Sequence, residues 1–249
     1  MVSTDRAPYI NYHEALNKPV KGENYSEVPL FIGKGSGSGS TSTIYSFNTY
    51  NDVKKVFNDS SDLSKTLKEF YIENNTNTDS TRRVNKCYVI NIGASGTVSD
   101  YLTALKNSKV KKDTTAVIFS GINWGAYTAP TTTEEVRTAG SYANQTTIKP
   151  VLLSALDIIH EDGDVESINQ METGLLRIIY VPLPSYCDAS SYSEGNAHTS
   201  VTDDALIDLM KYLRTTDSSA TSYNKKVQDS RMVFVESQAI LSDDEKNRE

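Results

Sequence analysis

The stretch CYVINIGASGTVSDYLTAL, residues 87–105, decides the fold of this chain. Its first seven residues are almost continuously apolar, which is typical of a strand buried on both faces of a sheet. After the turn at residues 93–97, Thr97 and Asp100 have the spacing of a capping box at the start of a helix. Another apolar run, residues 116–119, follows that helix. The segment therefore predicts a strand, a helix and a second strand of one parallel sheet.

The same alternation of apolar runs and helical spacing extends along most of the chain. Further strands are predicted at residues 28–33, 175–181 and 232–235, with a short extended piece at residues 44–47. Helices are predicted from Thr49, from Ser61, from Pro150 as a first-turn residue to Gly163, and from Asp203 as the capping residue. Residues 74–83 are expected to form a loop, and residues 134–138 a short helix. We therefore expect an α/β fold with a mainly parallel open sheet, helices on both faces and an extended N-terminal arm.

Three parts are expected along the 249 residues. An extended N-terminal arm at residues 1–25 precedes an α/β core domain at residues 26–241, and a flexible tail follows at residues 242–249. The arm lacks a sustained hydrophobic period, but residues 9–12 have the composition of a strand. A segment of this kind often becomes ordered only on a partner.

Composition excludes several classes of partner. The formal net charge of -7 argues against nucleic acid and against an anionic membrane surface, since both attract basic proteins. No apolar run approaches the ~20 residues of a membrane span. The first residues also lack the apolar centre of a signal peptide, so we expect intracellular synthesis without secretory export.

The cysteines and histidines give no sign of a metal or redox centre. Cys87 and Cys187 each lie in or just after an apolar run and are expected to be reduced, buried thiols. His13, His160 and His198 are not spaced as zinc ligands from one another or from a cysteine. We expect no metal and no cofactor.

Two glycine-rich turns at predicted strand ends are the candidate ligand sites. They are GKGSGSG at residues 33–39 and GASGT at residues 93–97. Glycines let backbone N–H groups approach phosphate oxygens, and ligands of open α/β sheets collect beyond the carboxyl ends of strands. The first turn matches neither the Walker pattern nor the dinucleotide-binding fingerprint and is interpreted as a linker. The second is interpreted as a tight turn. No serine or cysteine is paired with a base for nucleophilic catalysis.

Four pieces of sequence, taken in order, resemble the tail sheath proteins of contractile phages and related injection machines. They are VPLFIGKG at residues 28–35, YSFNTYNDVKKVF at residues 45–57, NKCYVINIG at residues 85–93, and YLTAL at residues 101–105 leading to TAVIF at residues 115–119. Proteins of that family begin with an arm, followed by an apolar strand with a glycine-rich turn, a helix and a further apolar strand. They usually carry an additional C-terminal domain, so we expect a shortened member, a fragment or an unusually small member of the family.

The resemblance implies a mechanical role without catalysis. Sheath subunits have a subtilisin-like α/β core without the protease triad, and they stack in rings around a tail tube. Terminal arms add strands to the sheets of neighbours, and contraction of the strained array drives the tube through an envelope. By this resemblance the arm strand donated between subunits is formed by Pro8, Tyr9, Ile10, Asn11 and Tyr12.

The partners implied by the resemblance are other copies of the chain, the tail tube protein, and the baseplate and tail terminator proteins. The implied location is a virion tail assembled in the host cytoplasm. Two other classes stay open. One is a doubly wound enzyme or nucleotide-binding protein with its ligand near Gly33–Gly39 or Gly93–Thr97. The other is a surface or adhesion protein, favoured by the Thr/Asn-rich loops, which would need an export signal.

Overall fold

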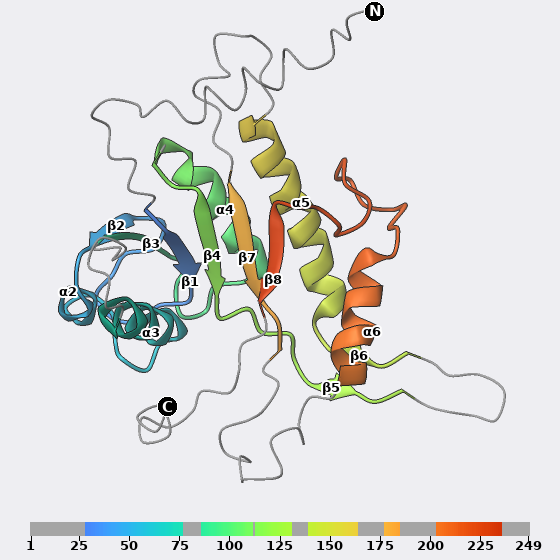
Figure 1. Cartoon of the computed structure of the whole chain (residues 1–249), viewed down its shortest axis with the longest axis horizontal. Coiled ribbons are helices and arrows are strands. Elements are labelled where there is room, and N and C mark those ends of the chain that lie inside the picture. The colour runs from blue at the N-terminus through green and yellow to red at the C-terminus, as the bar shows by residue number, and fades with distance from the viewer. Residues whose placement is uncertain are drawn as a thin grey trace, which may run out of the picture.

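The computed structural model describes residues 28–76, 86–111, 113–130, 139–163, 177–184 and 203–235, so the predicted arm and tail lie outside the described part. A six-stranded sheet forms the centre of the fold (Figure 1). In spatial order its strands are β2 (Ile44–Phe47), β3 (Cys87–Asn91), β1 (Leu30–Gly33), β4 (Ala116–Ser120), β7 (Ile178–Pro182) and β8 (Met232–Val235). Neighbouring strands are parallel, except that β2 pairs antiparallel with β3. The predicted mainly parallel α/β fold is confirmed.

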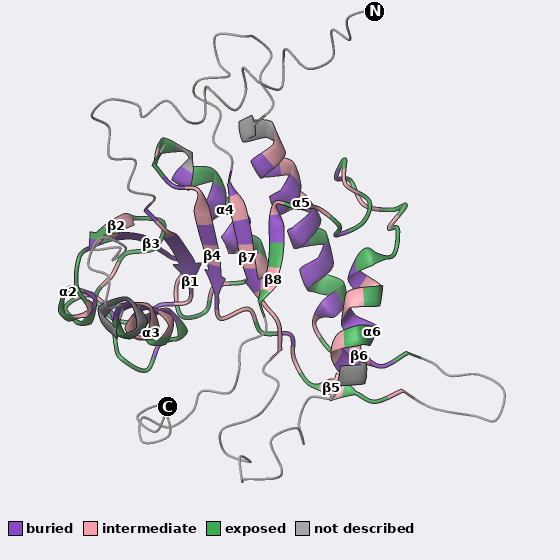
Figure 2. Ribbon diagram, in the orientation of Figure 1, coloured by how far each residue is buried: buried purple, intermediate pink, exposed green. Residues whose placement is uncertain are grey.

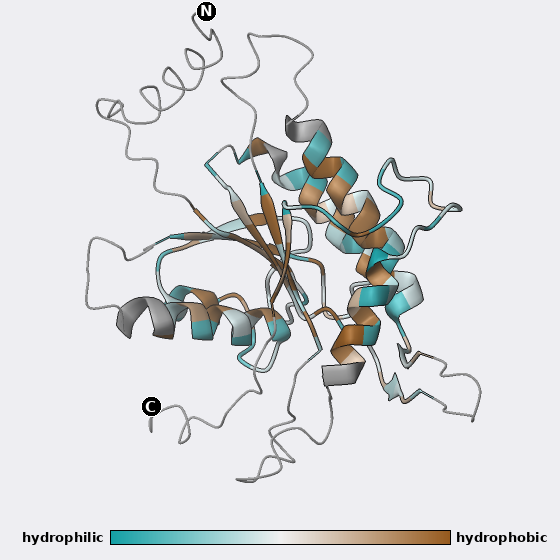
Figure 3. Cartoon of the chain, turned by 45° about the vertical axis from the view of Figure 1, so that its right-hand side comes forward, coloured by the Kyte–Doolittle hydropathy of each residue, from teal (hydrophilic) through white to brown (hydrophobic). Residues whose placement is uncertain are grey.

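Helices lie on both faces of this sheet, as predicted. On one face are α2 (Tyr50–Lys54) and α3 (Asp62–Thr76). On the other are α4 (Val98–Asn107), α5 (Gln145–Gly163) and α6 (Asp203–Arg214) (Figure 3). Right-handed crossovers require this division, because the chain moves one way across the sheet from β1 to β3 and the opposite way from β3 through β4 and β7 to β8. The remaining elements are a 3₁₀ turn, η3 (Ser108–Val110), and a small hairpin of β5 (Tyr127–Thr128) and β6 (Ser141–Tyr142).

Alternate residues of the strands enter two separate cores. In β1, Leu30 and Ile32 belong to the larger core on the side of α4 and α5, and Phe31 belongs to the smaller core beneath α2 and α3. The larger core includes residues of every parallel strand. Among the described residues, the smaller core reaches no further across the sheet than Ile118 of β4. The described residues therefore cover one face of the sheet across its width and the other only over its first half.

The predicted helix starts are largely confirmed by their capping contacts. The Thr49 hydroxyl accepts a hydrogen bond from the Asp52 N–H at 3.3 Å and begins α2. The Ser61 hydroxyl does the same for the Ser64 N–H at 3.3 Å, at the start of α3. Asp203 is the first residue of α6 rather than its capping residue. The predicted loop at residues 74–83 is wrong at its start, because α3 continues to Thr76.

The predicted start of α5 is also wrong. This helix begins at Gln145, which places Pro150 inside it. The Gln145 side chain accepts a hydrogen bond from the Tyr142 N–H at 2.9 Å, and the Ile148 N–H reaches the Asn144 carbonyl at 3.0 Å, so helical bonding starts before the proline. Pro150 is exposed, and its cost is one missing hydrogen bond to Thr146.

Two predicted elements lie partly or wholly outside the described residues. The strand predicted at residues 175–181 begins at Ile178, and its first two predicted residues lie outside the described part. The helix predicted at residues 134–138 lies outside it as well. Strand β8, by contrast, has the predicted bounds.

A buried lysine joins α5 to α6. Lys149 is 3% exposed, and its Nζ donates hydrogen bonds to the carbonyl oxygens of Tyr212 and Thr215 and to the Thr215 hydroxyl at 2.8–2.9 Å. It also lies 4.7 Å from the centre of the Tyr212 ring. Burial lowers the pKa of Lys149, partly opposed by the negative charge of Asp217. The ammonium group thus binds the carbonyl groups left free at the end of α6.

We expect Lys149→Met to destabilise the protein by about 2 kcal/mol, because the stem is kept while three charge-assisted hydrogen bonds are lost. The matched control is Lys211→Met, at an exposed position of α6, with an expected change below about 0.5 kcal/mol. Urea unfolding followed by circular dichroism measures both. Equal unfolding midpoints for the two variants would contradict a structural role of Lys149.

Candidate functional site

Several residues singled out in the sequence lie outside the described residues. They are the arm residues Pro8, Tyr9, Ile10, Asn11 and Tyr12, together with His13, Cys187 and His198. The role of the arm as a donated strand therefore stays a prediction. The described part of the chain does contain both glycine-rich turns, His160 and Cys87, and the two ends of the sheet.

The two glycine-rich turns meet at the side chain of Asn91, the last residue of β3. Asn91 is 3% exposed, and its Oδ1 accepts hydrogen bonds from the Gly35 N–H at 2.9 Å and from the Gly93 N–H at 2.7 Å. Its Nδ2 donates to the Gly39 carbonyl at 3.0 Å. An internal amide thus occupies backbone N–H groups that an anion would need.

The turn after β1 is packed against the protein, so its interpretation as a linker is wrong. The N–H groups of Ser38 and Gly39 donate to the Val56 carbonyl at 3.0 and 3.2 Å. Gly37 has a φ of +131°, and a Cβ there would lie 2.5 Å from the same carbonyl oxygen. The glycines permit close approach to the segment after α2 instead of conferring flexibility.

The turn after β3 is a tight turn, as expected, and it leads to a helix start that already holds a carboxylate. Gly93 has a φ of +86°, and the Gly96 N–H donates to its carbonyl at 3.0 Å. Asp100 Oδ2 accepts hydrogen bonds from the Thr97 N–H at 2.7 Å and the Thr97 hydroxyl at 2.8 Å. These bonds lower the pKa of Asp100 despite a small opposing effect of burial. The predicted capping box therefore places a negative charge where a bound anion would lie.

The position between β1 and β4 is also filled by side chains. Ligands of open α/β sheets bind where successive connections leave in opposite directions, which here is beyond the ends of these two strands. Ser120 at the end of β4 is 2% exposed, and its hydroxyl lies 2.6 Å from that of Thr66 in α3. The Tyr101 hydroxyl of α4 donates to the Ser120 carbonyl. A Cβ at Gly33 would lie 2.8 Å from Ser120 Cβ, so the two strand ends are in close contact.

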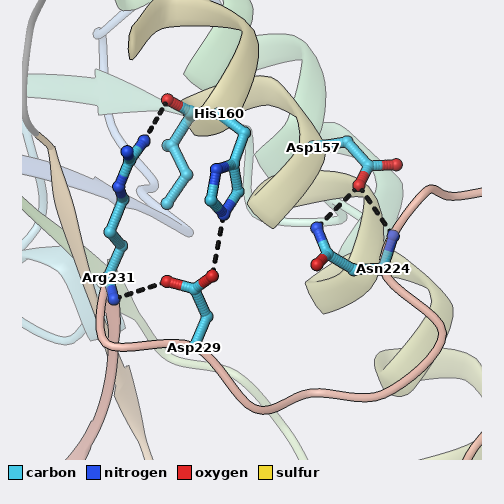
Figure 4. A network of polar contacts seen from close by, with 6 residues as sticks. Asp157, His160, Asn224, Asp229 and Arg231 are labelled. Atoms are coloured by element: carbon cyan, nitrogen blue, oxygen red, sulfur yellow. Dashed lines mark hydrogen bonds and ion pairs between the residues drawn. The ribbon is translucent and has the colours of Figure 1, made fainter. Parts of the chain in front are cut away.

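His160 links α5 to the chain before β8 (Figure 4). Its Nε2 lies 2.8 Å from Asp229 Oδ2, and Asp229 Oδ1 accepts a hydrogen bond from the Arg231 N–H at 2.8 Å. The Arg231 guanidinium donates to the Ile159 carbonyl at 3.2 Å. His160 therefore has a structural partner in Asp229.

Cys87 is a free, buried thiol, as predicted. Its sulfur lies 3.3 Å from the Tyr71 hydroxyl, and burial raises its pKa to about 11, partly opposed by that hydrogen bond. It is therefore protonated at neutral pH and is not a nucleophile. Within the described residues, no group of three or more His, Cys, Asp or Glu side chains is placed to hold a metal ion. No described helix is long and apolar enough to cross a membrane.

The outer edge of β8 is an open edge of the described sheet. The Ile179 N–H donates to the Arg231 carbonyl and the Leu183 N–H to the Val235 carbonyl, both at 2.8 Å. In a parallel ladder this directs the backbone groups of Phe234 away from β7, and no described strand pairs with them. Val233 and Val235 are 38% and 42% exposed. This surface could not be predicted from the sequence, because the run MVFV at residues 232–235 looks the same as a strand buried on both faces.

Comparison with known proteins identifies no relative. No family model matches the chain, and no curated protein matches it. The filled strand ends and the described open edge of β8 are the features of the structure that bear on function.

We expect Asn91→Ala to destabilise the protein by about 3 kcal/mol, because it leaves two N–H groups and one carbonyl without their partner. Asn123→Ala is the control, since Asn123 is exposed and accepts a single bond from the Gly125 N–H at 2.8 Å. That change is expected to cost about 1 kcal/mol or less. Urea unfolding tests the difference, and similar losses in the two variants would show that Asn91 has no special role.

The contribution of the Asp100 carboxylate to stability is expected to depend on pH. Since its pKa is lower in the folded state than in the unfolded chain, the stabilisation is present above about pH 4 and is lost as pH falls through the folded pKa. Asp100→Asn should lower stability at pH 7 by about 0.5–1 kcal/mol, the usual magnitude of a helix cap. Urea midpoints of both proteins between pH 7 and pH 3 should converge at the acid end. A difference independent of pH would contradict the assignment.

Proposed function

We propose that the chain is a structural subunit that assembles with copies of itself into a contractile tail sheath around a tube. The proposal is supported by the four pieces of sequence that resemble sheath proteins in the same order. It is also supported by an α/β core of the expected class. The observation that carries it is a contrast within the sheet. The strand ends, where an enzyme of this fold would bind its ligand, are filled by Asn91 and Ser120, while the edge at β8 is open in the described part.

In this proposal the arm at residues 8–12 of one copy adds a strand to the sheet of the next. Backbone hydrogen bonds then hold the subunits together without a reactive group. Such a contact is heterologous, since a donor surface meets a different acceptor surface, and repeated use produces rings or helical polymers. The further partners proposed are the tail tube protein and the baseplate and tail terminator proteins. Contraction would release free energy stored in the interfaces and drive the tube through an envelope.

The alternative of a doubly wound enzyme or nucleotide-binding protein has less support. It needs free N–H groups at the glycine-rich turns, and Gly35 and Gly93 donate theirs to Asn91. The start of α4 already holds the carboxylate of Asp100, which would repel a phosphate. No observation in the described residues favours a particular reaction.

Negative-stain electron microscopy of the purified protein, over a range of concentration and salt, tests the proposal. We expect tubes or stacked rings, and we expect deletion of residues 1–16 to abolish them. Deletion of residues 242–249 is the control and should leave the polymers unchanged. Polymers that persist without residues 1–16 would contradict the role of the arm, and a strict monomer that binds a nucleotide would favour the enzyme class.

A further inference from the structure

The second half of the sheet carries an apolar face without a helix on it among the described residues. On the face that α2 and α3 cover elsewhere, the register places Tyr180 of β7 beside Val233 of β8 and Pro182 beside Val235. Tyr180 and Pro182 are half-buried, and the two valines are exposed. Figure 2 shows the exposed positions on β8, and Figure 1 shows α2 and α3 grouped beside β1, β2 and β3.

The topology explains why this face has no described cover. Every connection from β3 onward moves in one direction across the sheet, and right-handed crossovers place all of its helices on the opposite face. The described connection from β1 to β3 carries α2 and α3. These helices lie on the same face as Val233 and Val235, but over the other half of the sheet. An apolar sheet face of this kind marks a place for another segment.

We propose that the outer edge of β8 and the adjoining face formed by Tyr180, Val233 and Val235 receive residues 8–12 of a second copy of the chain. The inference depends on the proposed function and names the acceptor surface for the donated strand. At the edge, no described strand pairs with the backbone groups of Phe234, and the face supplies exposed apolar side chains. Both are needed for strand addition, where the backbone gives affinity and the side chains give specificity.

The composition of the arm fits this surface. Residues 8–12 are uncharged, as are the four side chains of the exposed face. In an extended segment Ile10 and Tyr12 point to the same side, two residues apart like Val233 and Val235. An added strand would therefore place one apolar pair beside the other.

The arm is also long enough to reach a neighbour. Residues 13–27 separate Tyr12 from the described chain at Val28, and they span up to about 50 Å when extended. A six-stranded sheet is about 24 Å wide between its outer strands, since strands are spaced about 4.8 Å apart. The linking segment thus exceeds the width of its own sheet and can reach a second copy.

The opposite edge, at β2, is a poorer acceptor. The rings of Tyr45 and Phe47 stack with their centres 5.8 Å apart, and Phe57 packs against both at 5.5 and 6.1 Å. These aromatic side chains already have partners within the smaller core. An incoming strand at β2 would gain backbone bonds but would find no exposed apolar pair like that of β8.

Disulfide trapping between two full-length chains tests the assignment. In a Cys187→Ser background, chains with Ile10→Cys are mixed with chains carrying Val233→Cys on β8, or Ser46→Cys, an exposed position on β2, as the matched control. We expect at least tenfold more covalent dimer with Val233→Cys. Trapping at position 46 instead, or no trapping at position 233, would overturn the inference. Trapping within one chain carrying both Ile10→Cys and Val233→Cys, without trapping between mixed chains, would show that the arm binds its own sheet.

A charge variant provides a second measurement without new cysteines. The double substitution Val233→Lys and Val235→Lys places two charges on the proposed surface, and we expect it to reduce the polymer mass in sedimentation at least tenfold. Ile207→Lys, at a residue of α6 that is 47% exposed, is the control and should leave it unchanged. Polymers lost on deletion of residues 1–16 but kept in the double variant would leave the proposed function standing and refute β8 as the acceptor. Absence of polymers from the unmodified chain would refute the proposed function itself.

Discussion

The side-chain amide of Asn91 is the interaction on which the arrangement of the strand ends depends. It lies between two turns more than fifty positions apart in sequence, and it binds Gly35, Gly39 and Gly93 at the same time. A buried amide satisfies these backbone groups internally, which an enzyme of this fold would leave to its ligand. One polar residue at the end of an apolar strand therefore closes the two glycine-rich turns, and Ser120 fills the position at the end of β4.

The second constraint is the handedness of the connections. Because three successive crossovers move in the same direction, α4, α5 and α6 all lie on one face, and the larger core fills that side. Among the described residues, the opposite face is covered only beneath α2 and α3. The free surface thus lies at β7 and β8, far across the sheet from Asn91. The filled strand ends and the edge left open in the described part are the two features on which the proposed sheath function depends.

Much of the fold could be predicted from the sequence, because continuous apolar runs and helix caps are local signals. The bounds of β8 and the pairing of Thr97 with Asp100 are examples. The position of Pro150 within α5 was missed, since the contacts of Gln145 that start the helix are tertiary. The packed glycine turn was missed for a similar reason: repeated glycine and serine look alike in a linker and in a turn that closely approaches another segment.

The central claim, that the protein itself occupies its strand ends, is tested most directly by amide hydrogen exchange of the full chain with and without magnesium–ATP. We expect slow exchange in peptides covering residues 33–41 and 91–97, unchanged by the nucleotide, because Gly35 and Gly93 already donate to Asn91 and the N–H groups of Ser38 and Gly39 to Val56. Protection that increases with nucleotide concentration in these peptides would contradict the account and would indicate a ligand-binding protein.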